Sequence, residues 1–353
     1  MKPITRNSLY IAAACVMAGL LFVILSFAAG GFRLESISTG LPYEQRSYSY
    51  TLDEVKSLDI NGRFCDIRLA PSKSNELVIT TFENEQEYFE FDVSATRELS
   101  INQIINKRWY NYIGVHIDLV DRAMVIEVPE GLLGEIDVSS QSGTIHVTEL
   151  VTNDMVALSS KSGDIKVDGL SAPNQVSVNS KSGEIKLSKV LSGGDLTAAS
   201  ASGDIKVSGV QINGRMSVDS MSGGVKIDEG TVKEDLGINT HSGDASISAV
   251  QAARNILVKS SSGRVFLGQT VTDGDITVDT RSGDIRFKTI RANNFNFTSA
   301  SGEVNGDIDD ASENYTIRSK SKSGSIRLPD SGNGSKQLNV STKSGDIKID
   351  FLG

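Results

Sequence analysis

Serine, acidic and basic side chains recur together in phrases of the type Ser-Gly-acid-Ile-base, such as KSGDIKV at 161–167. The serine before each glycine, for example Ser162, could supply a series of nucleophiles. A nucleophilic serine needs a positioned base. The only histidines are His116, His146 and His241, and they fall at different places in the repeat. The serines are therefore predicted to line a bend rather than to react.

The acid and the base of each phrase, as in Asp164 and Lys166, form two charged columns. These columns could be a binding stripe, or a solvated face on which they neutralise each other. Exposed ion pairs each contribute little stability, and the acids are partnered by lysine, which favours the solvated face. Calcium-binding solenoids carry G-G-x-G-x-D-x-U-x nonapeptides, which are absent here. We therefore predict no metal site, no cofactor and no catalytic residue.

The elements that position these residues follow from the spacing of the glycines. Eight glycines are spaced by 20 residues, and three more follow at intervals of 19, 22 and 21. A fixed short period is the signature of a solenoid or repeat array. The glycines are Gly143, Gly163, Gly183, Gly203, Gly223, Gly243, Gly263, Gly283, Gly302, Gly324 and Gly345.

Apolar residues alternate with polar ones on both sides of each glycine. The positions seven and five before it, and two and four after it, are apolar and mostly β-branched, as in Val176, Val178, Ile185 and Leu187. Such alternation predicts strands buried on one face. Each repeat should be a strand, a tight bend at which the glycine supplies backbone freedom, and a second strand. Successive repeats should stack as parallel neighbours. The predicted fold is all-β: a right-handed parallel β-solenoid of about 20 residues per coil, preceded by one transmembrane helix.

The N-terminal segment predicts a membrane anchor. Residues 9–31 are almost wholly apolar and uncharged, which is long enough to span a bilayer. Lys2 and Arg6 precede it and predict a cytoplasmic N-terminus with the rest of the chain outside the cell. A cleaved signal peptide is the alternative, because Ser26-Phe27-Ala28 resembles a cleavage site. The predicted parts are a cytoplasmic tail (1–8), the helix (9–31), a linker (32–47), an irregular β region or cap (48–135) and the solenoid (136–353).

The segment before the repeats contains an aromatic cluster. It holds Trp109, Tyr110 and Tyr112, and Trp109 is the only tryptophan of the chain. These three side chains could bind a glycan or a protein partner, or they could belong to a hydrophobic cap, which terminal units of repeat proteins require. The net charge of −9 argues against nucleic acid as a partner.

The repeated S-G-[DE]-I-[KR] phrases, preceded by I-E-V-P-E-G-L at 126–132, resemble a bacterial family of unknown function whose members are called putative adhesins. LiaG-like membrane-anchored proteins, which are linked to envelope stress, are similar. The resemblance covers about residues 48–353 and implies a β-solenoid at the cell envelope. It implies no catalytic residues.

Together these features predict a non-catalytic cell-envelope scaffold or adhesin-like binding protein at the cell membrane. The expected partners are the membrane, through the N-terminal helix, and a cell-wall polymer or an envelope membrane protein. One alternative is a scaffold that self-associates end to end through exposed strand edges. The other is a polysaccharide-cleaving β-helix enzyme, which would need a cluster of acids that breaks the repeat, and the repeats show none.

Overall fold

The structure is a computed structural model that describes residues 17, 19, 41–106, 121–330 and 332–353. The chain divides into two compact units. The smaller unit comprises residues 1–45, 82–88 and 104–122. Within it, the Tyr43 hydroxyl donates a hydrogen bond to Glu87, and the Arg122 guanidinium lies 3.9 Å from the centre of the Tyr43 ring. The larger unit comprises residues 46–81, 89–103 and 123–353 and carries the repeats.

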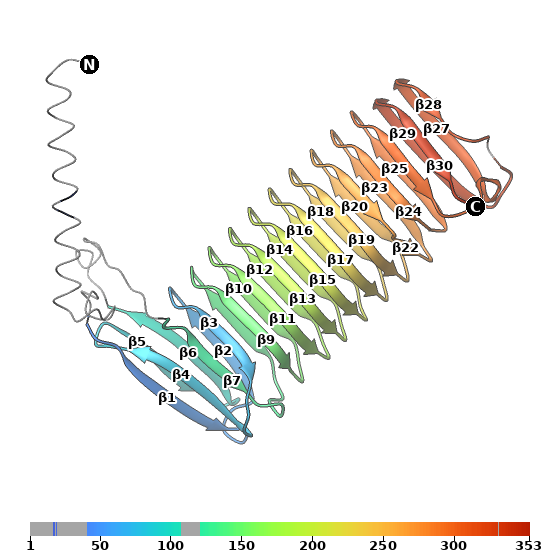
Figure 1. Cartoon of the computed structure of the whole chain (residues 1–353). Helices are drawn as coiled ribbons and strands as arrows, with labels where there is room; N and C mark the ends of the chain where they lie inside the picture. Colours follow the sequence, from blue (N-terminus) through green and yellow to red (C-terminus); the bar gives the residue numbers. More distant parts are fainter. Residues whose placement is uncertain (1–16, 18, 20–40, 107–120, 331) are drawn as a thin grey trace, which may run out of the picture. The chain divides into compact units, whose positions relative to one another are not determined.

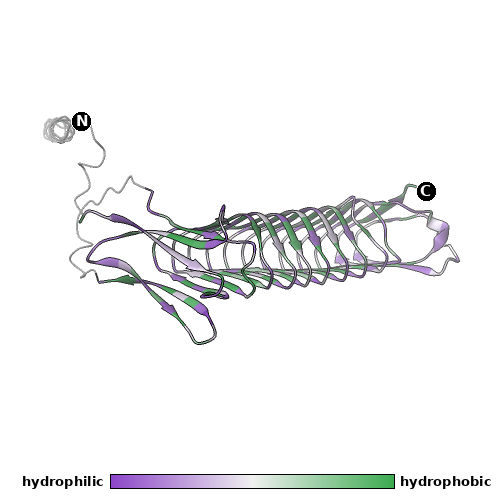
Figure 2. Ribbon diagram, turned by 90° about the horizontal axis from the view of Figure 1, so that it is seen from below, coloured by the Kyte–Doolittle hydropathy of each residue, from purple (hydrophilic) through white to green (hydrophobic). Residues whose placement is uncertain are grey.

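Two sheets run along the repeats and form two layers of strands (Figures 1 and 2). We call them sheet A and sheet B. Sheet B contains, in spatial order, β5 (Glu87–Val93), β6 (Glu98–Ile105), β2 (Ser57–Gly62), β8 (Ile136–Ser140), β10 (Val156–Ser160), β12 (Val176–Ser180), β14 (Leu196–Ser200), β16 (Met216–Ser220), β18 (Leu236–Thr240), β20 (Ile256–Ser260), β23 (Asp275–Thr280), β25 (Asn294–Ser299), β29 (Lys336–Ser344) and β27 (Tyr315–Ser323).

Sheet A lies across the core from sheet B and takes the strand that follows each bend. It contains, in spatial order, β1 (Glu44–Thr51), β4 (Glu76–Glu83), β7 (Met124–Val128), β3 (Ile67–Pro71), β9 (Ile145–Val151), β11 (Ile165–Ala172), β13 (Ile185–Ser192), β15 (Ile205–Ile212), β17 (Val225–Val232), β19 (Ala245–Ala252), β21 (Val265–Gly268), β24 (Ile285–Ile290), β26 (Val304–Ile308), β30 (Ile347–Phe351) and β28 (Ile326–Arg327). The short β22 (Val271–Thr272) pairs with β19, and a 3-10 helix, η3 (Ser312–Asn314), precedes β27.

The predicted β-solenoid is confirmed, with about 11 turns of about 20 residues each. Neighbouring strands pair in parallel and in register, so that Val156 lies beside Val176 and Ile185 beside Ile205. The apolar columns point between the sheets, and Ile185 and Ile205 are fully buried. Because a single coil buries too little apolar surface to fold alone, each coil is stabilised by its two neighbours.

The ladder begins earlier in the sequence than residue 136. Strands β2 and β3, which fall in the predicted irregular region 48–135, pair in register with β8 and β9. Their coil lacks the Ser-Gly phrase, and Cys65 stands near its bend, so the repeat pattern alone did not reveal it. The pairing of β4 with β7 is antiparallel.

The last two coils are stacked in the reverse of their sequence order. Strand β29 lies between β25 and β27, and β30 lies between β26 and β28 (Figure 1). The C-terminal segment 336–351 is thus inserted between the coils of Gly302 and Gly324. The prediction that successive repeats are always spatial neighbours is wrong here. The end of the ladder is formed by β27 and β28, which come before the inserted coil in the sequence.

The bend glycines are required by close contact rather than by backbone freedom, which corrects the prediction. Among the glycines of the described chain with positive φ are Gly169 and Gly209, and no bend glycine is one of them. A Cβ atom on Gly183 would lie 2.0 Å from the carbonyl oxygen of Gly163 in the next coil, and one on Gly223 would lie 2.1 Å from that of Gly203. Any side chain at these positions would therefore push the coils apart.

A column of buried serine and threonine residues, three positions before each glycine, closes the bend. The hydroxyl oxygens of Ser160, Ser180 and Thr280 accept hydrogen bonds from the N–H groups of Gly163, Gly183 and Gly283 at 2.8, 2.9 and 3.0 Å. These oxygens satisfy N–H groups that would otherwise be buried without a partner. The structural hydroxyls therefore belong to the column three positions before each glycine, and not to the predicted column directly before it, of which the exposed Ser162 is a member.

The predicted transmembrane helix, 9–31, lies outside the described residues apart from Met17 and Gly19. Among the residues that the structure describes, no helix has the length and apolar character needed to cross a bilayer.

Candidate functional site

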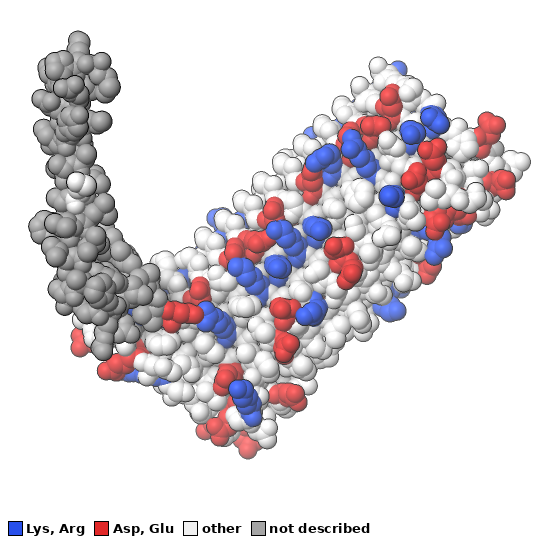
Figure 3. Space-filling view, viewed as in Figure 1, with Lys and Arg blue, Asp and Glu red and all other residues white. Residues whose placement is uncertain are grey.

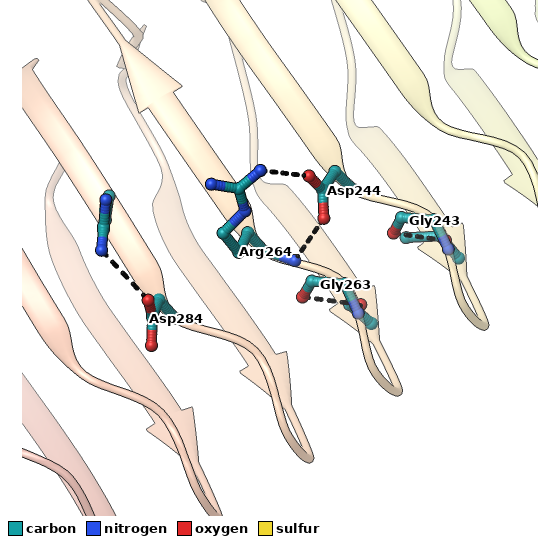
Figure 4. A network of polar contacts seen from close by, with 8 residues as sticks. Gly243, Asp244, Gly263, Arg264 and Asp284 are labelled. Carbon is teal, nitrogen blue, oxygen red and sulfur yellow. Dashed lines mark hydrogen bonds and ion pairs between the residues drawn. The ribbon is translucent and has the colours of Figure 1, made fainter.

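The aspartates directly after the bend glycines accept hydrogen bonds from the backbone of the next coil. The Asp244 carboxylate accepts a hydrogen bond at 2.8 Å from the N–H of Arg264, which holds the same position in the next coil (Figure 4). The N–H groups of Glu184 and Gly224 are bound in the same way by Asp164 and Asp204, at 2.9 and 2.8 Å. These aspartates therefore join coils, and they are not free for acid–base chemistry.

The aspartates alternate with other residues along the ladder. Each aspartate binds the N–H of the coil beyond it, so that one aspartate is needed for every two coils. The alternation continues through the reversed coils only in spatial order, because Asp346 binds the N–H of Ser325 at 2.7 Å. In spatial order the position holds Asp66, Thr144, Asp164, Glu184, Asp204, Gly224, Asp244, Arg264, Asp284, Glu303, Asp346 and Ser325.

The hydrogen bonds to Asp346 also affect the ionisation of its carboxyl group. They come from the N–H and the side chain of Ser325, and they lower the pKa of the Asp346 carboxyl below its ordinary value. A carboxylate that accepts hydrogen bonds is favoured in its charged form. Asp346 is thus a charged, hydrogen-bonded link between coils rather than a proton donor.

Most basic residues of the same face have acidic neighbours. Arg264 lies 2.9 Å from Asp244, Arg286 lies 3.2 Å from Asp284, and Lys206 pairs with Glu184. Positive and negative side chains are interleaved over the face of the ladder that Figure 3 presents. This is the solvated, self-neutralised face that the sequence favoured over a binding stripe.

A hollow follows the outer side of sheet B where its strands reach the bend, and we call it the corner groove. It consists of three adjoining cavities of about 510, 580 and 570 Å³ that share lining residues. The lining comes from the positions four, three and two before each bend glycine. The groove extends from Asn61 and Gly62 to Lys343 and so follows almost every coil of the larger unit.

The chemistry of the corner groove changes along its length. Its first part is lined by hydroxyls, amides and two lysines, Lys161 and Lys181. Its middle part has Met221 and His241 and a single charged residue, Asp219. Its last part has one acid, Asp279, and five cations: Lys259, Arg281, Lys320, Lys322 and Lys343. All five cations are exposed, and none of them forms an ion pair within the described part of the chain.

A polar contact holds the inserted coil in place at the other end of β29 from the cationic groove. Lys336, the first residue of β29, lies 2.7 Å from Asp310, and the buried Tyr315 hydroxyl donates to the same carboxylate at 3.0 Å. Burial acts to raise the pKa of Asp310, but hydrogen bonds from Lys336, Asn314, Ala311 and Tyr315 outweigh it and lower the pKa to about 2. Burial, and then the Asp310 charge, raise the pKa of Tyr315.

The aromatic residues that the sequence singled out, Trp109, Tyr110 and Tyr112, lie outside the described residues. Their role as a glycan or partner site stays a prediction. The corner groove was missed because its residues fall at outward positions where the repeat varies. Their signal in the sequence is the gathering of lysine and arginine at the positions four and two before the glycine in the last coils.

The fold and the groove define a class of protein, a parallel β-solenoid with one charged groove along its bends. Residues 55–269 and 174–350 match the model of the Toastrack DUF4097 family. These matches cover most of the chain, which therefore belongs to that family, and the resemblance seen in the sequence is confirmed. The two matches overlap, as expected for a repeat that aligns with itself.

The comparisons with solved structures give similarities at low identity. One is a "putative lipid binding protein" from Parabacteroides distasonis, with 17% identity, 90% of this chain and 98% of that chain covered, and a TM-score of 0.40. A "putative adhesin" from the same species has 14% identity, 86% and 97% coverage and a TM-score of 0.34. A "putative adhesin" from Bacteroides fragilis has 13% identity, 88% and 97% coverage and a TM-score of 0.28. No curated protein matches the chain.

Proposed function

We propose that this chain is a non-catalytic binding protein or scaffold of the cell envelope. The corner groove carries the proposal, because its lining is drawn from equivalent positions of successive coils. A groove of this kind repeats with the spacing of strands, about 4.8 Å per coil. It suits an extended ligand that lies along the ladder better than a compact substrate.

The use of the polar residues supports a non-catalytic role. The buried hydroxyls close the bends, as Ser160 does for Gly163, and the aspartates bind backbone N–H groups of the next coil. A catalytic acid or nucleophile needs a side chain that is free to exchange protons with a substrate. The repeated columns offer structural contacts instead, which favours binding over the alternative of a polysaccharide-cleaving enzyme.

The proposal places the chain at the cell membrane with the solenoid outside the cytoplasm. It rests on the apolar segment 9–31 and on Lys2 and Arg6 before it. The proposed partners are a cell-wall polymer or an envelope membrane protein, and the proposed setting includes envelope stress. A cleaved signal peptide would release the solenoid rather than anchor it, and mass measurement of the N-terminus of the mature protein distinguishes the two.

Self-association through the end of the ladder is disfavoured by the end itself. The outer strands there are β27 and the two-residue β28, and they carry Arg318, Lys320, Lys322 and Arg327. Short edge strands and edge lysines hinder pairing with another chain. We therefore expect the chain to bind envelope components rather than to build filaments.

Co-sedimentation tests the proposed function. The full chain, purified in a mild nonionic detergent, is centrifuged with isolated cell walls and, in parallel, without them. We expect pelleting only with walls. Pelleting without walls would indicate self-assembly, and a chain that stays in the supernatant in both samples would contradict wall binding. Trp109→Ala then tests whether the aromatic cluster contributes.

A further inference from the structure

The cationic end of the corner groove has the properties of an anion site rather than of a solvated face. Its five cations have one acid among them, Asp279, which sits beside Lys259 in the ladder. Asp279 also stands two residues before Arg281, whereas Lys320, Lys322 and Lys343 have no acidic neighbour in the groove lining. On the face of sheet A, in contrast, cations such as Arg264 and Arg286 lie within 2.9 and 3.2 Å of aspartates.

The last two coils of the ladder bring like charges together in this site. Ser321 pairs with Thr342 and Ser323 with Ser344, so Lys322 and Lys343 occupy equivalent positions of neighbouring coils. Like charges directly opposite each other in a sheet destabilise it. A fold that keeps such a pair without a compensating acid has a place where a bound anion would relieve the repulsion.

A small residue leaves room for the anion between the cations. The position of Lys322 and Lys343 is held by Ala300 in the next coil and by Arg281 in the coil beyond that. Ala300 thus lies between Lys343 and Arg281, and its methyl group leaves a hollow flanked by positive charge. Hydroxyl groups of Thr298 and Ser341 line the same cavity of about 570 Å³ and can donate hydrogen bonds to oxygens of the anion.

From these observations we infer that the cationic end of the corner groove binds a linear polymer that carries phosphate groups. Lysine binds phosphate as a point charge, and a groove that repeats from coil to coil matches a polymer with regularly spaced charges. Among the described residues, no phenylalanine, tyrosine or tryptophan lines any of the three cavities, so this part of the chain lacks the large aromatic platform on which single-stranded nucleic acids stack their bases. The inference rests on the proposed function and names the chemical class of the ligand.

The test is binding of inorganic polyphosphate to the full chain, measured by calorimetry at low and moderate salt. We expect saturable binding that weakens as the salt concentration rises. Neutralising Lys322 and Lys343 to Gln should reduce the affinity roughly twenty-fold, because each cation near an anionic array contributes about five-fold. The Arg variants of the same two residues should retain binding, and an unchanged melting temperature shows that the variants are folded.

A second variant removes the site without removing any cation. Ala300→Glu places a carboxylate in the hollow and should abolish binding. Ala201→Glu is the matched control, because Ala201 holds the equivalent position in the coil of Gly203, in the part of the groove without the five cations. Equal effects of the two variants, or no effect of Ala300→Glu, would overturn the assignment of the site.

Three further probes distinguish the source of the anion. They are polygalacturonate, oligothymidylate and phosphatidylglycerol vesicles, each compared with polyphosphate at matched negative charge. Tighter binding to any of them overturns the inference in favour of a carboxylate polymer, a nucleic acid or a membrane surface. If the wild-type chain pellets with cell walls but does not bind polyphosphate, the inference fails and the proposed function stands. If it does neither, both fail.

Discussion

The coils from Gly143 to Gly283 differ from the last three coils of the ladder in how sequence order relates to space. In the first region each repeat stacks on the one before it, and most cations of the sheet A face lie beside acids. In the last region the final segment, 336–351, is inserted one place back, and three cations of the groove, Lys320, Lys322 and Lys343, gather without an acid. The regular repeat thus builds the support, and the candidate site lies where the outward positions of the last coils carry lysine.

In the first region, substitutions in the buried apolar columns should reduce the stability of the fold most. Ile205 is fully buried between the sheets, so Ile205→Asp should lower the free energy of unfolding by about 4 kcal/mol or more. Lys206, the next residue, is exposed and pairs with Glu184, so Lys206→Ala should leave the melting temperature unchanged within error. Thermal melts of the two variants check this, and the reverse order would contradict the assignment of inner and outer columns.

The bend glycines provide the next largest effect. A Cβ atom at Gly223 would lie 2.1 Å from the carbonyl oxygen of Gly203, so Gly223→Ala should cost about 3 kcal/mol. The matched control is Gly237→Ala in β18, where the nearest atom, the carbonyl oxygen of Met216, is 3.9 Å away. Denaturant unfolding should show a loss only for Gly223→Ala. Equal losses would mean that the coils are not as closely stacked as described.

In the last region, Asp310 should make the stability of the inserted coil depend on pH. Its pKa is about 2 in the folded chain against an ordinary value of 3.8, so its charged form is favoured by folding. This contribution, about 2 kcal/mol, is complete above about pH 5 and is lost as the pH falls through 3.8 and then through the folded pKa of about 2. Asp310→Asn should lack this dependence. The unfolding midpoints of both proteins are measured between pH 2 and 5. If the two midpoints change in parallel, the predicted role of Asp310 is wrong.

The smallest expected effect concerns a left-handed residue that each regular coil places six positions after its glycine. Thr289 has a φ of 55° there, and Gly209 holds the equivalent position with a φ of 61°. Because a β-branched residue is strained at positive φ and glycine is not, Thr289→Gly should stabilise the chain by about 0.5–1 kcal/mol. Gly209→Ala should destabilise it by a similar amount, and melts of both variants give the sign.

Much of the first region could be predicted from the sequence. The apolar columns and the constant spacing define strands, register and core, because parallel in-register stacking repeats one local environment in every coil. The reason for the bend glycines could not be predicted, since the contact that excludes a side chain at Gly223 comes from another coil. The same holds for the buried hydroxyl column, of which Ser160 is a member.

The last region was less predictable, although it contains a usable signal. Aspartates alternate with other residues along the ladder, and only the reversed order of Asp346 and Ser325 preserves that alternation. In sequence order, Glu303 would be followed by Ser325 and then by Asp346, and the alternation would be lost. In the groove this order decides that Ser341, and not Lys320, lies beside Thr298. A single sequence gives the columns, but the order of the coils depends on their contacts.

The measurement that most directly tests the account is disulfide crosslinking of the last coils. With Cys15 and Cys65 replaced by Ser, Thr298→Cys is combined either with Ser341→Cys, its in-register neighbour, or with Lys320→Cys, its neighbour if the coils stacked in sequence order. Adjacent strands lie about 4.8 Å apart, within reach of a disulfide, and strands two places apart do not. We predict crosslinking of 298 with 341 only. Efficient crosslinking of 298 with 320 would contradict the inserted coil and the place of Ser341 beside Thr298 in the groove.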